Sequence, residues 1–207
     1  MDDPKVIYDI VQYAQYFDSL KLSKPIRVTY KPIEDSSATV ISDVDDVIKK
    51  GNELTAVGVT ATRVTIDPSS EVYYMDVNSN WYKSAEEWEV MFILRYETRR
   101  IYQIDQIGKL NRGEPVSKDK NTIRQWEDNY KNYIPNTKAT RHKHFNQACE
   151  IDAYSYAKLM EAVDMRNADD SRAATPKNYS YPYSQCPGME KVIEDIVDRM
   201  FEKRLGK

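Results

Sequence analysis

Apolar residues at the beginning of the chain recur every three or four positions, which is the spacing of one face of a helix. Within residues 4–20 this face carries Val6, Ile7, Ile10, Val11, Tyr13, Ala14 and Phe17. The pattern predicts an amphipathic opening helix.

Four stretches that follow are rich in β-branched and aromatic residues and lie between turn signals. They are residues 26–30, 38–41, 56–66 and 71–77. We predict a strand in each. Residues 67–70 are a loop short enough for a hairpin, which indicates antiparallel pairing between the last two strands.

The middle of the chain predicts a long helix. Ser84 is followed three residues later by Glu87, the spacing of a capping box, so we expect the helix to run from residue 85 to residue 106 or 107, before Gly108. Its apolar stripe consists of Val90, Ile93, Leu94, Ile101 and Ile104. Glu97 lies within this stripe, so its carboxylate is not expected to be a merely solvated one.

Three further helices are predicted, over residues 122–130, 146–163 and 189–205. The last has a strong apolar stripe, which must dock on the body of the protein or on a partner. Residues 164–188 contain three prolines and few large aliphatic residues, which favours an irregular connection. The predicted organisation is therefore a domain over residues 1–163, a connection over 164–188 and a C-terminal helix within 189–207.

Composition narrows the function classes. The chain has 207 residues, of which 41% are hydrophobic and 30% charged, ordinary values for a globular protein. A net charge of -3 disfavours nonspecific nucleic-acid binding by the whole surface. The longest apolar run, residues 90–94, is far shorter than the about 20 residues of a membrane span, and the acidic beginning is unlike a signal peptide. We expect a cytoplasmic protein without membrane contact.

The cysteine and tyrosine content narrows the function classes less. Cys149 and Cys186 show no paired metal spacing and no disulfide framework, so two reduced thiols are expected. The chain has 16 tyrosines, a residue that suits both interfaces and half-buried cores.

Residues 92–103 read Phe-Ile-Leu-Arg-Tyr-Glu-Thr-Arg-Arg-Ile-Tyr-Gln, with Glu97 at their centre. This helix resembles the His-Glu-x-x-His helix of zincin metallopeptidases, including ImmA/IrrE-like proteins, with both histidines replaced. Residues 145–157 are similar to the Glu-x-x-Ala-x-x-aromatic-Ala helix that supplies the third zinc ligand in that group, and Glu150 matches the ligand.

The resemblance implies an α+β, zincin-like fold. In it a small, mainly antiparallel sheet packs against the motif helix and the glutamate helix, and the C-terminal amphipathic helix is an addition. The positions of the two histidines hold Tyr96 and Arg100. A phenol titrates near ~10 and a guanidinium keeps its proton, so neither is a zinc ligand at neutral pH. We therefore expect a pseudo-metallopeptidase with a vestigial Glu97, no active catalytic residue and no cofactor.

Arg100 offers a substitute for the metal. Two carboxylates brought together without a cation would repel each other, and a guanidinium three residues after Glu97 could bridge Glu97 and Glu150. We predict an ion pair of Arg100 with one or both. The alternative is a solvated basic face, in which Arg95, Arg99 and Arg100 pair with Glu86, Glu87 and Glu89.

The two histidines, His142 and His144, lie among cations just before the glutamate helix, and we expect exposed loop histidines. A relocated zinc site that uses His142, His144 and Glu150, with Cys149 as a further ligand, stays open as an alternative, although its spacing matches no known pattern. Cys149 beside His144 is a weaker candidate for a nucleophile and its base, because a cysteine on a helix is more often packed.

Three functions compete. The first is a catalytically inactive zincin-like protein that binds another macromolecule, for which the resemblance suggests a phage or mobile-element regulator or an inhibitor of host defence. The second is an active peptidase with a relocated metal and Glu97 as general base. The third is a nucleic-acid-associated protein. We expect a protein partner rather than nucleic acid, and a homodimer through the C-terminal helix stays open. Candidate binding residues are Arg95, Arg99, Tyr102 and Tyr154.

Overall fold

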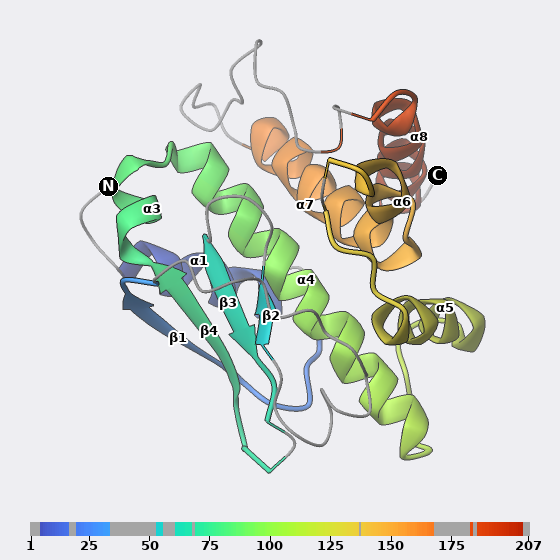
Figure 1. Ribbon diagram of the computed structural model, residues 1–207, viewed down its shortest axis with the longest axis horizontal. Coiled ribbons are helices and arrows are strands. Elements are labelled where there is room, and N and C mark those ends of the chain that lie inside the picture. Colours follow the sequence, from blue (N-terminus) through green and yellow to red (C-terminus); the bar gives the residue numbers. More distant parts are fainter. Residues whose placement is uncertain are drawn as a thin grey trace.

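The computed structural model describes residues 5–16, 20–33, 53–55, 61–67, 69–136, 138–167, 183 and 186–204. These residues form an α+β fold, in which helices cover a small mixed sheet (Figure 1). The predicted strand at residues 38–41 lies outside the described residues.

The predicted opening helix is present as α1, Lys5–Tyr16. Its inner side buries Ile7 and Val11, which join the main hydrophobic core, while Tyr8 points outward and is 52% exposed.

The sheet has four strands in the order β1-β4-β3-β2. They are β1, Ile26–Lys31; β2, Glu53–Thr55; β3, Thr62–Thr65; and β4, Tyr73–Asn78. β1 runs parallel to β4, and the other two pairings are antiparallel. The predicted hairpin between the last two strands is thus confirmed. The strand predicted over residues 56–66 is described only from residue 61, and this part contains β3. β2 was not predicted.

The beginning of the central helix differs from the prediction. Ser84 ends a short helix, α3, Ser79–Ser84, and its hydroxyl donates to the Trp81 carbonyl at 3.0 Å. It is therefore not the cap of α4, Glu87–Asn111, whose N-cap is Glu86 without a side-chain hydrogen bond. α4 also continues past Gly108 and ends before Gly113, which adopts a positive φ of 74°.

The remaining helices are α5, Lys120–Lys131; α6, Arg141–Phe145; α7, Ala148–Asn167; and α8, Met189–Arg204. α5, α7 and α8 match predicted helices to within a few residues. Asp119 caps α5 by accepting a 2.9 Å hydrogen bond from the Thr122 amide. α6 was not predicted, because its residues carry no apolar periodicity.

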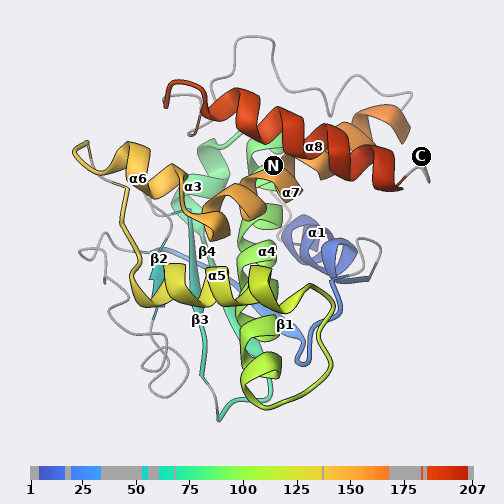
Figure 2. The same ribbon diagram turned by 90° about the vertical axis from the view of Figure 1, so that its right-hand side faces the viewer.

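α4 is the centre of the packing. The sheet and α1 lie against one side of it, and α5 and α7 cover another (Figures 1 and 2). α8 packs on α7 through Met189, Ile193 and Val197, which belong to a second hydrophobic cluster with Phe92, Tyr154 and Tyr183. The C-terminal helix therefore docks on the body of its own chain.

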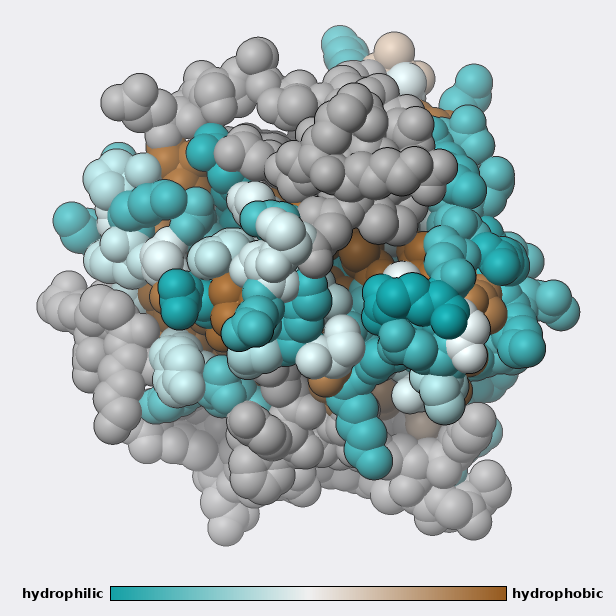
Figure 3. Space-filling view, turned by 90° about the horizontal axis from the view of Figure 1, so that it is seen from below, coloured by the Kyte–Doolittle hydropathy of each residue, from teal (hydrophilic) through white to brown (hydrophobic). Residues whose placement is uncertain are grey.

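One face of the molecule can be judged by its hydropathy. The side seen from below shows hydrophilic residues with smaller hydrophobic areas between them (Figure 3). Within the described part of the chain, no helix combines the length and the apolar character needed to cross a membrane.

The seam between α4 and α7 is held by charged groups. Arg99 donates two hydrogen bonds to Asp152, from Nε at 2.7 Å and from Nη2 at 2.8 Å, and Gln103 Nε2 donates to the same carboxylate at 2.7 Å. The guanidinium also lies over the rings of Tyr102 and Tyr156, 4.5 and 5.2 Å from their centroids.

The idea of a solvated basic face is therefore wrong. Arg95, Arg99 and Arg100 are only 3%, 3% and 1% exposed. α5 and α7 cover Arg99 with Trp126 and Asp152, and α5 covers Arg100 with Tyr130. Burial by itself would raise the pKa of Asp152, but Arg99 and Gln103 outweigh it and hold that pKa below its usual value.

Breaking this cross-link should destabilise the fold. Asp152→Ala leaves the buried Arg99 guanidinium without its carboxylate, so we expect the free energy of unfolding to fall by about 3 kcal/mol in urea denaturation. Glu114→Ala is the matched control, since the Arg112–Glu114 pair is 55% and 45% exposed. It should cost less than about 1 kcal/mol. Equal losses in the two variants would contradict this role of Asp152.

Candidate functional site

The residues that the motif singles out lie together in the interior. Tyr96 and Arg100 are one helical turn apart on α4, and with Glu97 they are 4%, 1% and 0% exposed. Glu150, in the first turn of α7, faces them and is also 0% exposed. α4 and α7 pack against each other, so residues more than fifty positions apart share one site.

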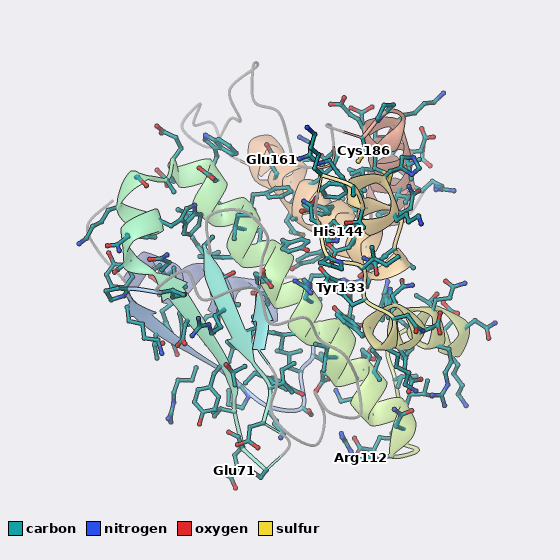
Figure 4. The ribbon with its side chains drawn as sticks, viewed as in Figure 1. Glu71, Arg112, Tyr133, His144, Glu161 and Cys186 are labelled. Atoms are coloured by element: carbon teal, nitrogen blue, oxygen red, sulfur yellow. The ribbon has the colours of Figure 1, made fainter. Side chains whose placement is uncertain are left out.

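Glu150 is the most fully bonded member. Tyr96 Oη donates to its Oε2 in a short hydrogen bond, and Tyr133 Oη donates to its Oε1 at 2.8 Å. His144 Nε2 lies 3.7 Å from Oε2. Figure 4 shows Tyr133 and His144 close together where α4, α6 and α7 meet. Three side chains from three segments therefore surround one carboxylate.

Arg100 takes a position between the two carboxylates and a set of aromatic rings. Its Nη1 lies 3.8 Å from Glu97 Oε2, so the predicted ion pair with Glu97 is present. Within the described residues there is no ion pair of Arg100 with Glu150, because phenols occupy that carboxylate instead.

The rings of Tyr96, Tyr130 and Tyr133 surround the guanidinium, with centroids 5.6, 5.9 and 5.5 Å from Cζ. Burial would lower the pKa of Arg100, but Tyr96, Tyr133 and the two carboxylates raise it well above its usual value. Arg100 is therefore a permanent cation inside the protein.

Glu97 is the carboxylate of the site that lacks hydrogen-bond partners among the described residues. Burial raises the pKa of its carboxyl to about 7, Arg100 opposes that rise, and Glu150 adds to it. Among described residues, neither carboxylate oxygen has a partner at hydrogen-bond distance, since the contact to Arg100 is longer than a hydrogen bond. Burial thus favours the neutral, protonated form of the Glu97 carboxyl.

His144 corrects the prediction of two exposed loop histidines. It lies on α6 and is 2% exposed, whereas His142 is exposed. His144 Nδ1 is 2.9 Å from the Ile134 carbonyl, which can only accept, so Nδ1 carries a hydrogen and Nε2 is directed toward Glu150. His144 is buried because the turn at residues 146–147 folds α6 back on α7.

The residues present do not fit the zinc ion that the resemblance implies. The phenol of Tyr96 is bonded to Glu150, and burial raises its pKa well above the usual value. Arg100 repels a cation. In the described ranges, no group of three or more His, Cys, Asp or Glu side chains could hold a metal ion. His142 is exposed, and burial raises the pKa of Cys149 well above its usual value, which disfavours the thiolate that binds metals.

The other chemical candidates are interior residues. Cys149 and Cys186 are free thiols and both are buried, so Cys149 lacks the access and the thiolate character of a nucleophile. The candidate binding residues Arg95, Arg99, Tyr102 and Tyr154 are all at most 7% exposed. They are therefore interior residues of the described fold.

Sequence reasoning missed Tyr130, Tyr133 and Thr62 at this site, and it named His144 only as a candidate zinc ligand or base. Tyr130, Tyr133 and His144 come from α5, the loop after it and α6. Thr62 comes from β3 and opposes the raised pKa of Glu97. The excess of tyrosines was the one available signal, since Tyr96, Tyr130 and Tyr133 all serve here.

Comparisons of the chain with protein-family models, curated protein sequences and solved structures found no match.

Glu97 should make stability depend on pH. Its pKa is about 7 in the folded protein against an ordinary 4.5, so folding takes up a proton between these values. The stabilisation is complete below pH 4.5 and is lost as pH rises through 7. The free energy of unfolding should fall by up to about 3 kcal/mol over that interval.

Urea denaturation at pH 5 and pH 8 measures this loss. Glu97→Gln, which keeps the shape and cannot ionise, should remove most of the difference between the two pH values. An unchanged pH dependence in Glu97→Gln would assign the effect to other groups.

Proposed function

We propose that this protein is a zincin-like pseudoenzyme that acts by stoichiometric binding of another macromolecule. The resemblance of the α4 and α7 segments to the zincin motifs supplies the framework. The replacement of two metal ligands by Tyr96 and Arg100 removes the chemistry.

One observation carries the proposal. Tyr96 and Arg100 are engaged with the same two carboxylates that would face the metal in a zincin, through the Tyr96–Glu150 hydrogen bond and the Arg100–Glu97 ion pair. Both carboxylates are 0% exposed. A general base must come within hydrogen-bond reach of a water or a substrate, and Glu97 is packed among protein side chains instead.

An internal cation also explains why the two replacements occur together. A carboxylate pair without a metal would repel, and one guanidinium offsets that repulsion while the phenols bond to Glu150. The active peptidase with a relocated metal is the weaker hypothesis, because it needs a ligand set that the described residues do not supply.

The resemblance extends this proposal to a biological setting. Zincin-like proteins of this kind occur in phages and mobile elements, where they act on repressors or on host defence. Inhibition by binding needs surface complementarity and no turnover, so it is compatible with a closed site.

Restoring the histidines tests the proposed ancestry. Tyr96→His/Arg100→His places two imidazoles one turn apart beside Glu150, and we expect it to retain about one equivalent of zinc by mass spectrometry after desalting. The unaltered protein, prepared without chelator and given one equivalent of zinc, should retain almost none.

Tyr96→His/Arg100→Gln is the matched control, because it opens the same space with one ligand fewer. It should bind zinc about 100-fold more weakly than the double histidine variant. Zinc retention by the unaltered protein would overturn the pseudoenzyme. A folded double histidine variant without zinc would overturn the zincin-like arrangement.

A further inference from the structure

One stretch of the chain has an unusual charge balance. Residues 129–149 contain Lys131, Lys138, Arg141 and Lys143 and no aspartate or glutamate. The whole chain has 30 lysines and arginines against 33 acidic residues, so the remainder holds 26 against 33, a net charge of -7. Because it lacks acidic residues, this stretch has a net positive charge in a protein that is otherwise acidic.

The cations of this stretch are directed outward. Lys138, His142 and Lys143 are exposed, and Arg141 is half-buried. We call residues 138–143 the basic segment. Among the residues that the structure describes, none forms an ion pair with Lys138, Arg141 or Lys143, whereas Lys131 pairs with Glu127 at 3.2 Å. Three positive charges within six residues thus have no counter-charge among the described residues.

Hydrogen bonds hold the basic segment in place at its two ends. Gln147 accepts from the Ile134 amide at 2.9 Å and donates to the Ile134 carbonyl at 3.0 Å. Thr140 Oγ1 donates to the Pro135 carbonyl at 2.5 Å, and His144 Nδ1 bonds to the Ile134 carbonyl. A surface ordered before binding loses less entropy when a partner docks.

The neighbourhood of the basic segment limits the partner. α6 lies beside the beginning of α8 (Figures 1 and 2). Burial raises the pKa of the Cys186 thiol, and Arg141 is close enough to oppose part of that rise. The outward face of α8 carries the exposed acids Glu190, Glu194, Asp195 and Asp198. A long polyanion such as a nucleic-acid strand would meet these carboxylates, with Lys191 and Arg199 among them, if it ran from the basic segment along α8.

The described residues form no large apolar face on which a partner could dock. Of the large hydrophobic residues in the described ranges, only Tyr8 and Val192 are exposed, at 52% and 41%, and they lie on different helices. A contiguous apolar patch is the usual mark of a hydrophobic interface. Charge is therefore the property by which this surface can select a partner.

We propose that the basic segment docks a short acidic segment of a partner protein, with Lys138, Arg141 and Lys143 pairing with its carboxylates. This inference rests on the proposed binding function and names the chemistry of the partner. Paired charges across such an interface accelerate association and give a strong dependence on salt. His144 and Tyr133 connect this surface to Glu150 in the interior.

The test uses the full chain and a fluorescein-labelled peptide of about ten residues rich in glutamate and aspartate. Fluorescence anisotropy at about 50 mM salt should show binding that weakens as the salt concentration rises. Lys138→Gln/Arg141→Gln/Lys143→Gln should weaken it about tenfold or more. Lys21→Gln/Lys83→Gln/Lys120→Gln removes the same charge from exposed positions elsewhere and should change affinity less than about twofold.

Three outcomes would overturn the proposal. They are no binding of the peptide at low salt, equal losses in the two triple variants, and tighter binding of an oligothymidylate of equal length than of the acidic peptide. The last would assign the surface to nucleic acid. None of these readouts depends on zinc, so failure here leaves the zinc test of the pseudoenzyme intact, and zinc binding by the unaltered protein would leave this surface standing.

Discussion

The main constraint on this fold is that α4 carries charged side chains on the sides that neighbouring elements cover. α4 buries Arg95, Glu97, Arg99 and Arg100 between the sheet and the other helices. Taking an unpaired charge out of water costs several kcal/mol, by an order-of-magnitude estimate, so the elements packed on α4 must bring partners with them. α7 supplies Asp152 for Arg99 and Glu150 for the cluster around Arg100, and the helices dock only where these pairs meet.

The same constraint shapes the candidate site. Glu150 accepts hydrogen bonds from two phenols, whereas Glu97 has a guanidinium beyond hydrogen-bond distance. Burial raises the pKa of Glu97, and Arg100 opposes only part of that rise. A cluster of this kind adds less stability than a well-packed apolar core, because desolvation cancels much of the Coulomb attraction. Under the proposed function, the buried cluster has no part in recognition, which is proposed to lie on the basic segment of residues 138–143.

Sequence reasoning succeeded where local pattern decides structure. The stripe of α4, the hairpin of β3 and β4 and the apolar face of α8 follow from periodicity, because burying one face against one neighbour leaves a repeat in the residue order. The Arg100–Glu97 pair could also be predicted, since residues three apart on a helix are neighbours. The end of α3 at Ser84, the helix α6 and the burial of His144 could not be predicted, because each depends on a turn whose geometry is set by contacts from elsewhere.

The residue order by itself determined which side chains lie on α4. It also excluded Tyr96 and Arg100 as zinc ligands, because the intrinsic pKa of a phenol or a guanidinium is set by the residue type. Only the tertiary structure decided that Glu150 faces Tyr96, Tyr133 and His144, and that the arginines of α4 are interior. The physical reason is that helix periodicity tells which residues lie on a common face but not what covers that face. Which elements cover a helix face is decided by the packing of segments far apart in the chain. There the desolvation of each charge must be offset by a partner that local sequence does not reveal.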